Sequence, residues 1–144
     1  MRIAVLNGSP KGHQSVTMQY VQYIEKRFPR HRFTYIDISE KIQRLEKNNH
    51  AFQEVIDVVK DADGILWAFP LFYFLVPSQY KRFIELIHER RVEDAFCNKY
   101  TALLSTSIHI HDMMAHHYIN AICDDLQMKY TGSFSASMYD LLKK

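Results

Sequence analysis

Short apolar runs alternate with amphipathic segments along the whole chain. The first run, residues 2–6, ends at the turn residues 7–12, as a buried strand followed by a loop would. Four further runs of strand character lie at residues 32–38, 64–69, 100–104 and 129–134. The run 64–69 is nearly apolar on both faces, which is typical of a strand in a sheet that helices cover on both sides.

The segments between these runs have the periodicity of helices. Val16, Tyr20, Ile24 and Phe28 form one apolar stripe, which Pro29 ends. The same spacing predicts helices over residues 52–60, 80–87 and 115–126. The order is therefore strand then helix, four times, followed by a fifth strand, which indicates parallel strands joined by right-handed crossovers.

The end of the chain is short for this architecture. Only residues 136–144 follow the fifth strand, too few for a full covering helix. We therefore expect one face of the fifth strand to be exposed. Two explanations stay open: a partner covers this face, or the single α/β domain of residues 1–144 is the N-terminal part of a longer polypeptide.

Composition narrows the class of protein. The net charge of +2 is too small to indicate a nucleic acid or an anionic membrane as partner, and no apolar run approaches the roughly 20 residues of a membrane span. The N-terminal apolar run is too short for a signal peptide. Two cysteines, Cys97 and Cys123, cannot build a disulfide framework or a four-cysteine metal site. We expect a cytoplasmic protein.

The first loop with candidate chemistry follows the first strand. It carries Ser9, Lys11, Ser15 and Thr17 directly before a helix, whose free N-terminal amides bind phosphate well. The pattern matches neither the P-loop nor the Gly-x-Gly-x-x-Gly fingerprint. The plainer alternative is that Ser15 only caps the helix.

Two more loops follow the third and fourth strands. Residues 70–77 enclose six apolar or aromatic residues between two prolines, which suits a wall for a planar ring or a homodimer patch. Residues 105–107 offer consecutive hydroxyls for the polar edge of a heterocycle, and Asp112 is a candidate helix cap. The nearby histidines have partial metal-ligand spacing, but no glutamate accompanies them, and we predict no metal site; they are His109, His111, His116 and His117.

Two signatures join these loops. The stretch 7–12, followed by Ser15 and Thr17, resembles the phosphate loop of flavodoxin-like NAD(P)H-dependent FMN reductases. Residues 69–70, Pro77, Lys81 and the run 83–85 are similar to the flavin-loop signature of the same family. The resemblance covers essentially the whole chain. It implies a flavodoxin-like three-layer sandwich with sheet order 2-1-3-4-5, its last covering helix missing or truncated.

The resemblance also implies a site and a reaction. FMN would accept electrons from NADH or NADPH and pass them to a quinone, a flavin or a redox partner, with no side chain as acid or base. The residues implied for the phosphate are Ser9, Lys11, Gln14, Ser15, Val16 and Thr17. Those implied for the ring and its polar edge are Pro70, Leu71, Phe72, Tyr73, Ser105, Thr106 and Ser107.

Relatives of this kind often pair as homodimers that complete the flavin site. Iron–sulfur members carry a cysteine cluster after the second strand, but residues 41–50 contain no cysteine. Ile108 and His109 stand where relatives often have glycines. This departure, with the short C-terminus, keeps open an alternative function as an assembly or electron-transfer module without reductase activity.

Overall fold

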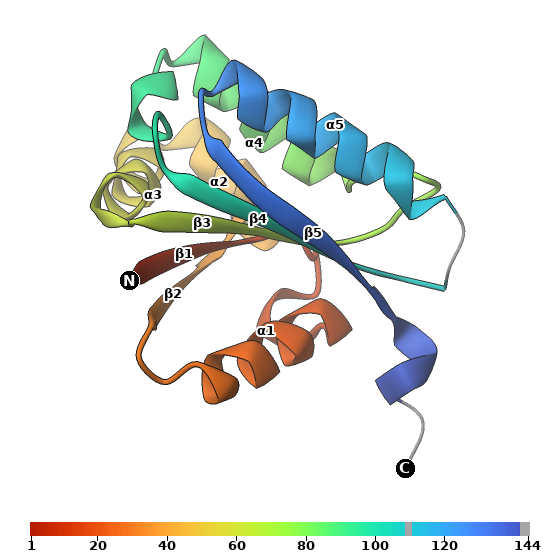
Figure 1. Ribbon diagram of the computed structural model, residues 1–144. Coiled ribbons are helices and arrows are strands. Elements are labelled where there is room, and N and C mark those ends of the chain that lie inside the picture. Colours follow the sequence, from red (N-terminus) through yellow and green to blue (C-terminus); the bar gives the residue numbers. More distant parts are fainter. Residues whose placement is uncertain (109–110, 142–144) are drawn as a thin grey trace.

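The computed structural model describes residues 1–108 and 111–141 (Figure 1). The strands among them are β1 (Arg2–Asn7), β2 (Arg32–Asp37), β3 (Gly64–Pro70), β4 (Tyr100–Ser107) and β5 (Lys129–Ser137). The α-helices are α1 (Val16–Arg27), α2 (Ile38–Lys47), α3 (Asn49–Asp61), α4 (Ser78–Glu89) and α5 (Asp112–Asp125). Short 3₁₀ turns are η1 (Gly12–Gln14), η2 (Glu93–Ala95) and η3 (Met138–Leu141).

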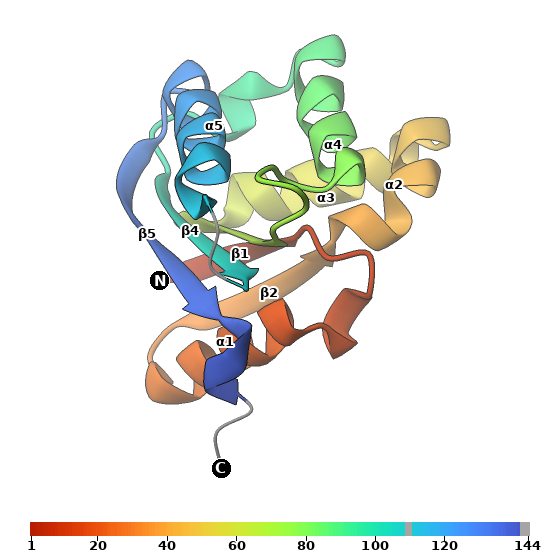
Figure 2. The same ribbon diagram turned by 90° about the vertical axis from the view of Figure 1, so that its right-hand side faces the viewer.

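The five strands form one parallel sheet in the order β2-β1-β3-β4-β5, which confirms the predicted topology. β1 lies between β2 and β3, so the strand order reverses beside it. Because all strands run in the same direction, the loops after β1, β3 and β4 leave the sheet at one edge (Figure 2). Ligands of open α/β sheets bind at this kind of edge, near the reversal of strand order.

The two faces of the sheet are covered unequally. Helices α2, α3, α4 and α5 lie on one face and α1 lies on the other (Figure 1). The larger core, on the four-helix side, is built on aromatic residues that include Trp67, Phe69, Tyr80 and Phe96. The smaller core under α1 consists of Val5, Met18, Val21, Ala68 and Leu104.

Helix α2 is a correction to the sequence prediction, which placed only four helices in the chain. The stripe Ile38, Ile42 and Leu45 is buried against the sheet. The sequence prediction placed Ile38 in the second strand, at residues 32–38, which left only two positions of this stripe to indicate a helix. Asn48 separates the two helices, since its side chain caps α3 by accepting a hydrogen bond of 3.0 Å from the amide of Ala51. β5 is also three residues longer than predicted, at Lys129–Ser137.

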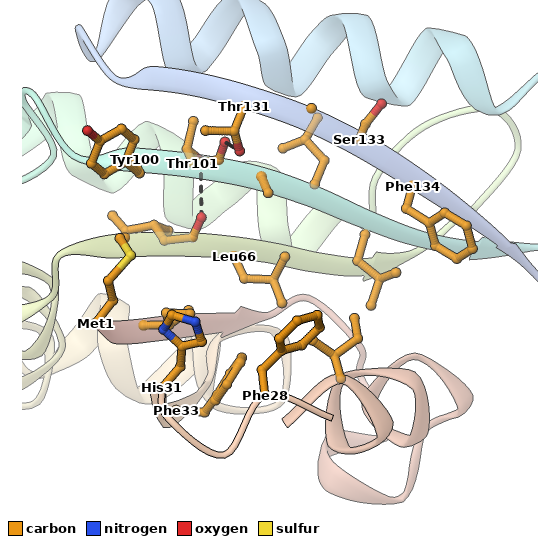
Figure 3. A pocket seen from close by; sticks show the side chains of 18 residues that line it. Met1, Phe28, His31, Phe33, Leu66, Tyr100, Thr101, Thr131, Ser133 and Phe134 are labelled. Atoms are coloured by element: carbon orange, nitrogen blue, oxygen red, sulfur yellow. Dashed lines mark hydrogen bonds between the residues drawn. The ribbon is translucent and has the colours of Figure 1, made fainter. Parts of the chain in front are cut away.

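The α1 face of the sheet is open beneath β3, β4 and β5, as expected from the short C-terminus. An apolar groove of about 790 Å³ lies there, bordered by α1 and the loop that follows it (Figure 3). Phe28 and Phe134 are both more than half exposed along it, and no Asp, Glu, Lys or Arg is among the residues that line it. After β5, η3 is the last element in the described part of the chain.

Candidate functional site

A second pocket, of about 650 Å³, lies at the carboxyl ends of β1, β3 and β4. Pockets for small molecules commonly enclose roughly 300–1,000 Å³. Every predicted site residue except Gln14 and Ser105 lines it. The lining residues are Ser9, Pro10, Lys11, Ser15, Val16, Thr17, Pro70, Leu71, Phe72, Tyr73, Phe74, Thr106, Ser107, Ile108 and Met138. The larger groove on the open face contains none of the predicted residues.

The loop from β1 to α1 forms one end of this pocket. Ser15 is the N-cap of α1, where its Oγ accepts a hydrogen bond of 3.2 Å from the amide of Met18. The amides of the first helical turn have no partner within the helix, and the helix dipole makes this end positive. The capping role of Ser15 is therefore confirmed, and its hydroxyl proton stays available for an anion at the same place.

Two glycines let this loop pass close to its neighbours. A Cβ on Gly8 would lie 2.9 Å from Cβ of Phe69, so a side chain there would push the loop off β3. Gly12 has φ of +57°, and a Cβ on it would collide with the carboxylate of Glu40 on α2. The loop is thus held between the third strand and the second helix.

The loop after β3 forms the aromatic wall. The amide of Phe72 donates to the carbonyl of Leu75 at 2.7 Å, and the carbonyl of Phe72 accepts from the amide of Leu75 at 3.0 Å, so the loop closes as a tight hairpin. Tyr73 and Phe74 at its tip both have positive φ, 42° and 72°, which is unusual for bulky residues. Tyr73 is 94% exposed. The hairpin therefore presents its rings at the pocket mouth.

Phe74 lines the pocket together with Phe72 and Tyr73. Its ring also meets the ring of His111 edge-on, with centroids 5.1 Å apart. Phe74 is not among the residues that the resemblance implies for the ring, and its place in the run 70–77 suits a homodimer patch equally well. The conformation of the hairpin turns Phe74 toward the pocket. The sequence could not predict this direction, because residues in an irregular loop have no fixed periodicity.

The end of β4 supplies the polar side. Thr106 and Thr17 join their hydroxyls at 2.7 Å, and whichever donates, the other keeps its proton for a ligand. Ser107 donates a hydrogen bond of 2.9 Å to Asp112, the first residue of α5. These contacts connect β4 to a helix on each face of the sheet.

Ser105 does not reach the pocket. Ser105 shares a face of β4 with Ser107, but it lies two residues further from the carboxyl end of the strand, where it contacts α5 instead of the pocket. Ser105 is fully buried and its Oγ lies 2.7 Å from Nε2 of His116. Gln14 belongs to η1, is exposed and does not border the pocket either. His109 lies outside the described residues.

His116 is a buried histidine whose pKa is lowered, chiefly because burial disfavours the imidazolium. The carboxylate of Asp112 opposes this shift and His117 adds to it. With a lowered pKa in the fold, the stabilising contribution of neutral His116 is present above the pKa of the unfolded chain and is lost as the pH falls below it.

We therefore expect acid to destabilise the wild-type protein more than a His116→Gln variant, which cannot take up this proton. The measurement is the melting temperature from about one pH unit above to about one unit below the ordinary histidine pKa of about 6.5. The difference between the two proteins should widen toward acid in favour of the variant. Parallel pH profiles would contradict the buried, neutral state of His116.

The described part of the chain shows no metal site, no disulfide bond and no membrane-spanning helix. Among residues 1–108 and 111–141, no group of three or more His, Cys, Asp or Glu is placed to hold a metal ion. Cys97 and Cys123 are not joined to each other, and burial raises the pKa of Cys123 to about 11. No helix in these ranges is long and apolar enough to cross a membrane.

An open parallel sheet with a helix N-terminus and an aromatic wall at its switch point defines an α/β protein built to bind a nucleotide-like ligand. The family model for NADPH-dependent FMN reductases matches residues 1–139, and the chain belongs to that family. It is an NAD(P)H-dependent FMN oxidoreductase, with FMN as cofactor and NAD(P)H as electron donor.

Solved structures share the fold at low sequence identity, which confirms the flavodoxin-like class. The apo form of the NADH:FMN oxidoreductase EMOB has a TM-score of 0.77 at 18% identity, over 99% of this chain and 80% of that chain. FerB from Paracoccus denitrificans, an NAD(P)H:(acceptor) oxidoreductase, has a TM-score of 0.71 at 17% identity, over 95% and 75%. General stress protein 14 from Treponema denticola, in complex with FMN, has a TM-score of 0.71 at 14% identity, over 98% and 88%. No curated protein matches the sequence.

Proposed function

We propose that the 650 Å³ pocket is the FMN site and that the enzyme passes electrons from NAD(P)H to a planar acceptor such as a quinone or a flavin. The observation that carries the proposal is the convergence of two loops and the end of β4 on one pocket. The first loop supplies hydroxyls and helix amides, the second an aromatic wall, and β4 a polar rim. These are the chemistries that a phosphate, a planar ring and a pyrimidine edge require.

Each part of FMN then has its partners. Ser9, Ser15 and Thr17, with the amides at the start of α1, hold the phosphate, and Lys11 adds a positive charge. The ring lies on the wall formed by residues 70–73, and its polar edge meets Thr106 and Ser107.

FMN supplies the hydride chemistry when bound, so the lining residues bind, orient and exclude water. Among the described residues that line the pocket, Lys11 and Tyr73 are the only ones with a titratable side chain. Neither is buried: both are exposed at the surface. The described part of the pocket wall therefore contributes no buried acid or base to the reaction.

The acceptor would enter beside the exposed hairpin tip. Phe72, Tyr73 and Phe74 are all exposed by more than two fifths of their surface, and they surround the opening with aromatic faces. Aromatic pairs gain roughly 0.5–1.5 kcal/mol beyond the area they bury. This wall favours a planar acceptor over an aliphatic or highly charged one.

The test is direct. The purified protein is titrated with FMN while flavin fluorescence is followed, and the loaded protein is then mixed with NADH or NADPH and a quinone. We expect saturable quenching and oxidation of the nicotinamide that depends on both FMN and quinone. Absence of FMN binding would overturn the proposal. Binding without nicotinamide oxidation would favour the electron-transfer module instead.

The aromatic wall gives a prediction of its own. Tyr73→Ala should weaken FMN binding by about 1 kcal/mol beyond the lost area, and Phe72→Ala should act in the same direction. Phe74→Ala should affect binding less, since its ring is also engaged with His111. Equilibrium FMN titration of the three variants ranks them. If only Phe74→Ala weakens binding, the ring does not lie on this wall.

We also propose that the protein is a homodimer in which a second copy covers the open sheet face. The groove there is apolar, and no Asp, Glu, Lys or Arg is among the described residues that line it. Apolar surface left in water costs about 25 cal/mol per Å². Sedimentation at micromolar concentration should show a dimer, and Phe134→Glu should dissociate it while Tyr23→Glu, an exposed aromatic that does not line the groove, should not. A monomeric wild-type protein would contradict this arrangement.

A further inference from the structure

A buried carboxylate lies next to the phosphate loop. Asp37 is the last residue of β2 and only 8% exposed. It occupies the N-cap position of α2, where an aspartate ordinarily accepts a hydrogen bond from the first helical turn. Its side chain makes no such bond in this helix. Capping therefore does not explain why a carboxylate is buried here.

Both oxygens of Asp37 are instead engaged by the loop after β1 and by α2. Oδ1 accepts a hydrogen bond of 2.9 Å from Nδ2 of Asn7, its register partner on β1. Oδ2 lies 3.3 Å from Nε2 of His13 and 3.6 Å from Nζ of Lys41. Asn7 is fully buried, whereas His13 and Lys41 are half exposed. The carboxylate thus joins β1, the loop and α2 at one point.

The contact with Asn7 continues into the loop that lines the pocket. Because Asn7 donates its amide group to Asp37, its Oδ1 faces the loop and accepts a bond of 3.0 Å from the amide of Ser9. Oγ of Ser9 accepts in turn from the amide of Lys11 at 3.3 Å. Ser9 and Lys11 line the pocket, and Asp37 does not. The carboxylate can act on a ligand there only through these residues.

We infer that Asp37 is a positioning residue that sets the phosphate loop for FMN, by orienting Asn7 on one side and holding His13 on the other. The inference rests on the proposed function of the pocket. A carboxylate near an anion site repels the anion, and this one is tolerated because Lys41, together with His13 when protonated, offsets its charge.

The direction in which FMN affinity changes when Asp37 is removed distinguishes a positioning role from a purely electrostatic one. If Asp37 acted only as a nearby negative charge, removing it would tighten the binding of a phosphate dianion. If it positions the loop, removing it releases the Asn7 side chain and weakens binding. The loss should be specific to the phosphate, because the hydrogen bonds of this network lead to Ser9 and Lys11, at the end of the pocket formed by the loop from β1 to α1.

The experiment measures dissociation constants for FMN and for riboflavin, which lacks the phosphate, on wild type, Asp37→Ala and Asp37→Asn. For Asp37→Ala we expect the FMN constant to rise by about tenfold or more, while the riboflavin constant changes by less than about threefold. Asp37→Asn keeps an acceptor for Asn7 but loses the pairing with His13 and Lys41. Its FMN dissociation constant should therefore lie between those of wild type and Asp37→Ala.

Asp125→Asn is the matched charge control. Asp125 is exposed at the last residue of α5, at the opposite edge of the sheet from the pocket, and both constants should stay at their wild-type values. Thermal melts establish that each variant folds. If Asp37→Ala does not fold, the comparison of Asp37→Asn with wild type decides the test. Unchanged or tighter FMN binding by folded Asp37 variants, or an equal loss for FMN and riboflavin, would overturn the inference.

Failure of the proposed function gives a different result. If the wild-type protein binds neither FMN nor riboflavin, the pocket is not a flavin site. Amide hydrogen exchange of residues 8–15 then decides the role of Asp37 by itself. Faster exchange in Asp37→Asn, with unchanged exchange in Asp125→Asn, supports a loop set by this carboxylate. Equal exchange in both variants and wild type overturns it.

Discussion

Riboflavin is expected to bind the wild-type protein at least about a hundredfold more weakly than FMN. A hydrogen bond to a charged group contributes roughly 1.5–3 kcal/mol. Ser15 and Thr17 provide two hydroxyls at the start of α1, so the phosphate should contribute at least about 3 kcal/mol, or about a factor of a hundred. The free amides of the helix add to this difference.

Fluorescence titration with FMN and with riboflavin measures this difference in affinity. A Ser15→Ala/Thr17→Ala double variant shows whether the difference arises from the two hydroxyls. The variant should lose most of the preference for FMN and keep its affinity for riboflavin. Its melting temperature will also fall, because Ser15 caps α1 and Thr17 pairs with Thr106. Ser78→Ala, at an exposed serine that does not line the pocket, serves as the control. Equal wild-type affinities for the two flavins would contradict the placement of the phosphate.

Trp67→Ala is expected to cost about 3–5 kcal/mol of unfolding free energy, as for other large buried aromatic residues. Trp67 lies at the centre of β3 and is fully buried. Its ring stacks on Phe96 at 6.2 Å and meets Tyr80 edge-on at 5.7 Å. Deleting it leaves a cavity between the sheet and the helices that cover it. Urea denaturation provides the measurement.

Trp67→Phe is the informative companion to this variant. The indole Nε1 is buried without a hydrogen-bond partner among the described residues. Leaving such a group unsatisfied costs roughly 1–3 kcal/mol, so removing it offsets part of the lost packing. We expect Trp67→Phe to destabilise the protein far less than Trp67→Ala. Equal losses for the two variants would mean that the indole nitrogen is satisfied in solution.

The sequence alone was sufficient for the fold class and for most of the pocket. The alternation of apolar runs with helical stripes predicted the parallel sheet, because hydrophobic periodicity is local and survives without tertiary information. The stretch 7–12 and the run 70–77 were recognisable because turn residues and an apolar loop stand out from their surroundings. These features led to the family that the chain belongs to.

Helix α2 needed the tertiary structure. Its stripe of Ile38, Ile42 and Leu45 begins in the run 32–38 that the sequence assigned to a strand, and only the structure shows that β2 ends at Asp37 and that a helix follows. The hydroxyls of β4 that reach the pocket were equally hidden. Ser105, Thr106 and Ser107 are similar hydroxyl residues in a row, and only the structure shows that Ser105 is buried against His116 of α5 while Thr106 and Ser107 line the pocket.

The chain could not reveal its long-range polar pairs either. Asn7 and Asp37 are thirty residues apart and meet because β1 and β2 pair in register. Thr17 and Thr106 meet because α1 packs against β4. Local patterns determine which elements form and which loops carry unusual residues. Strand order and register determine which of those residues touch, because pairing brings together side chains whose separation along the chain carries no signal.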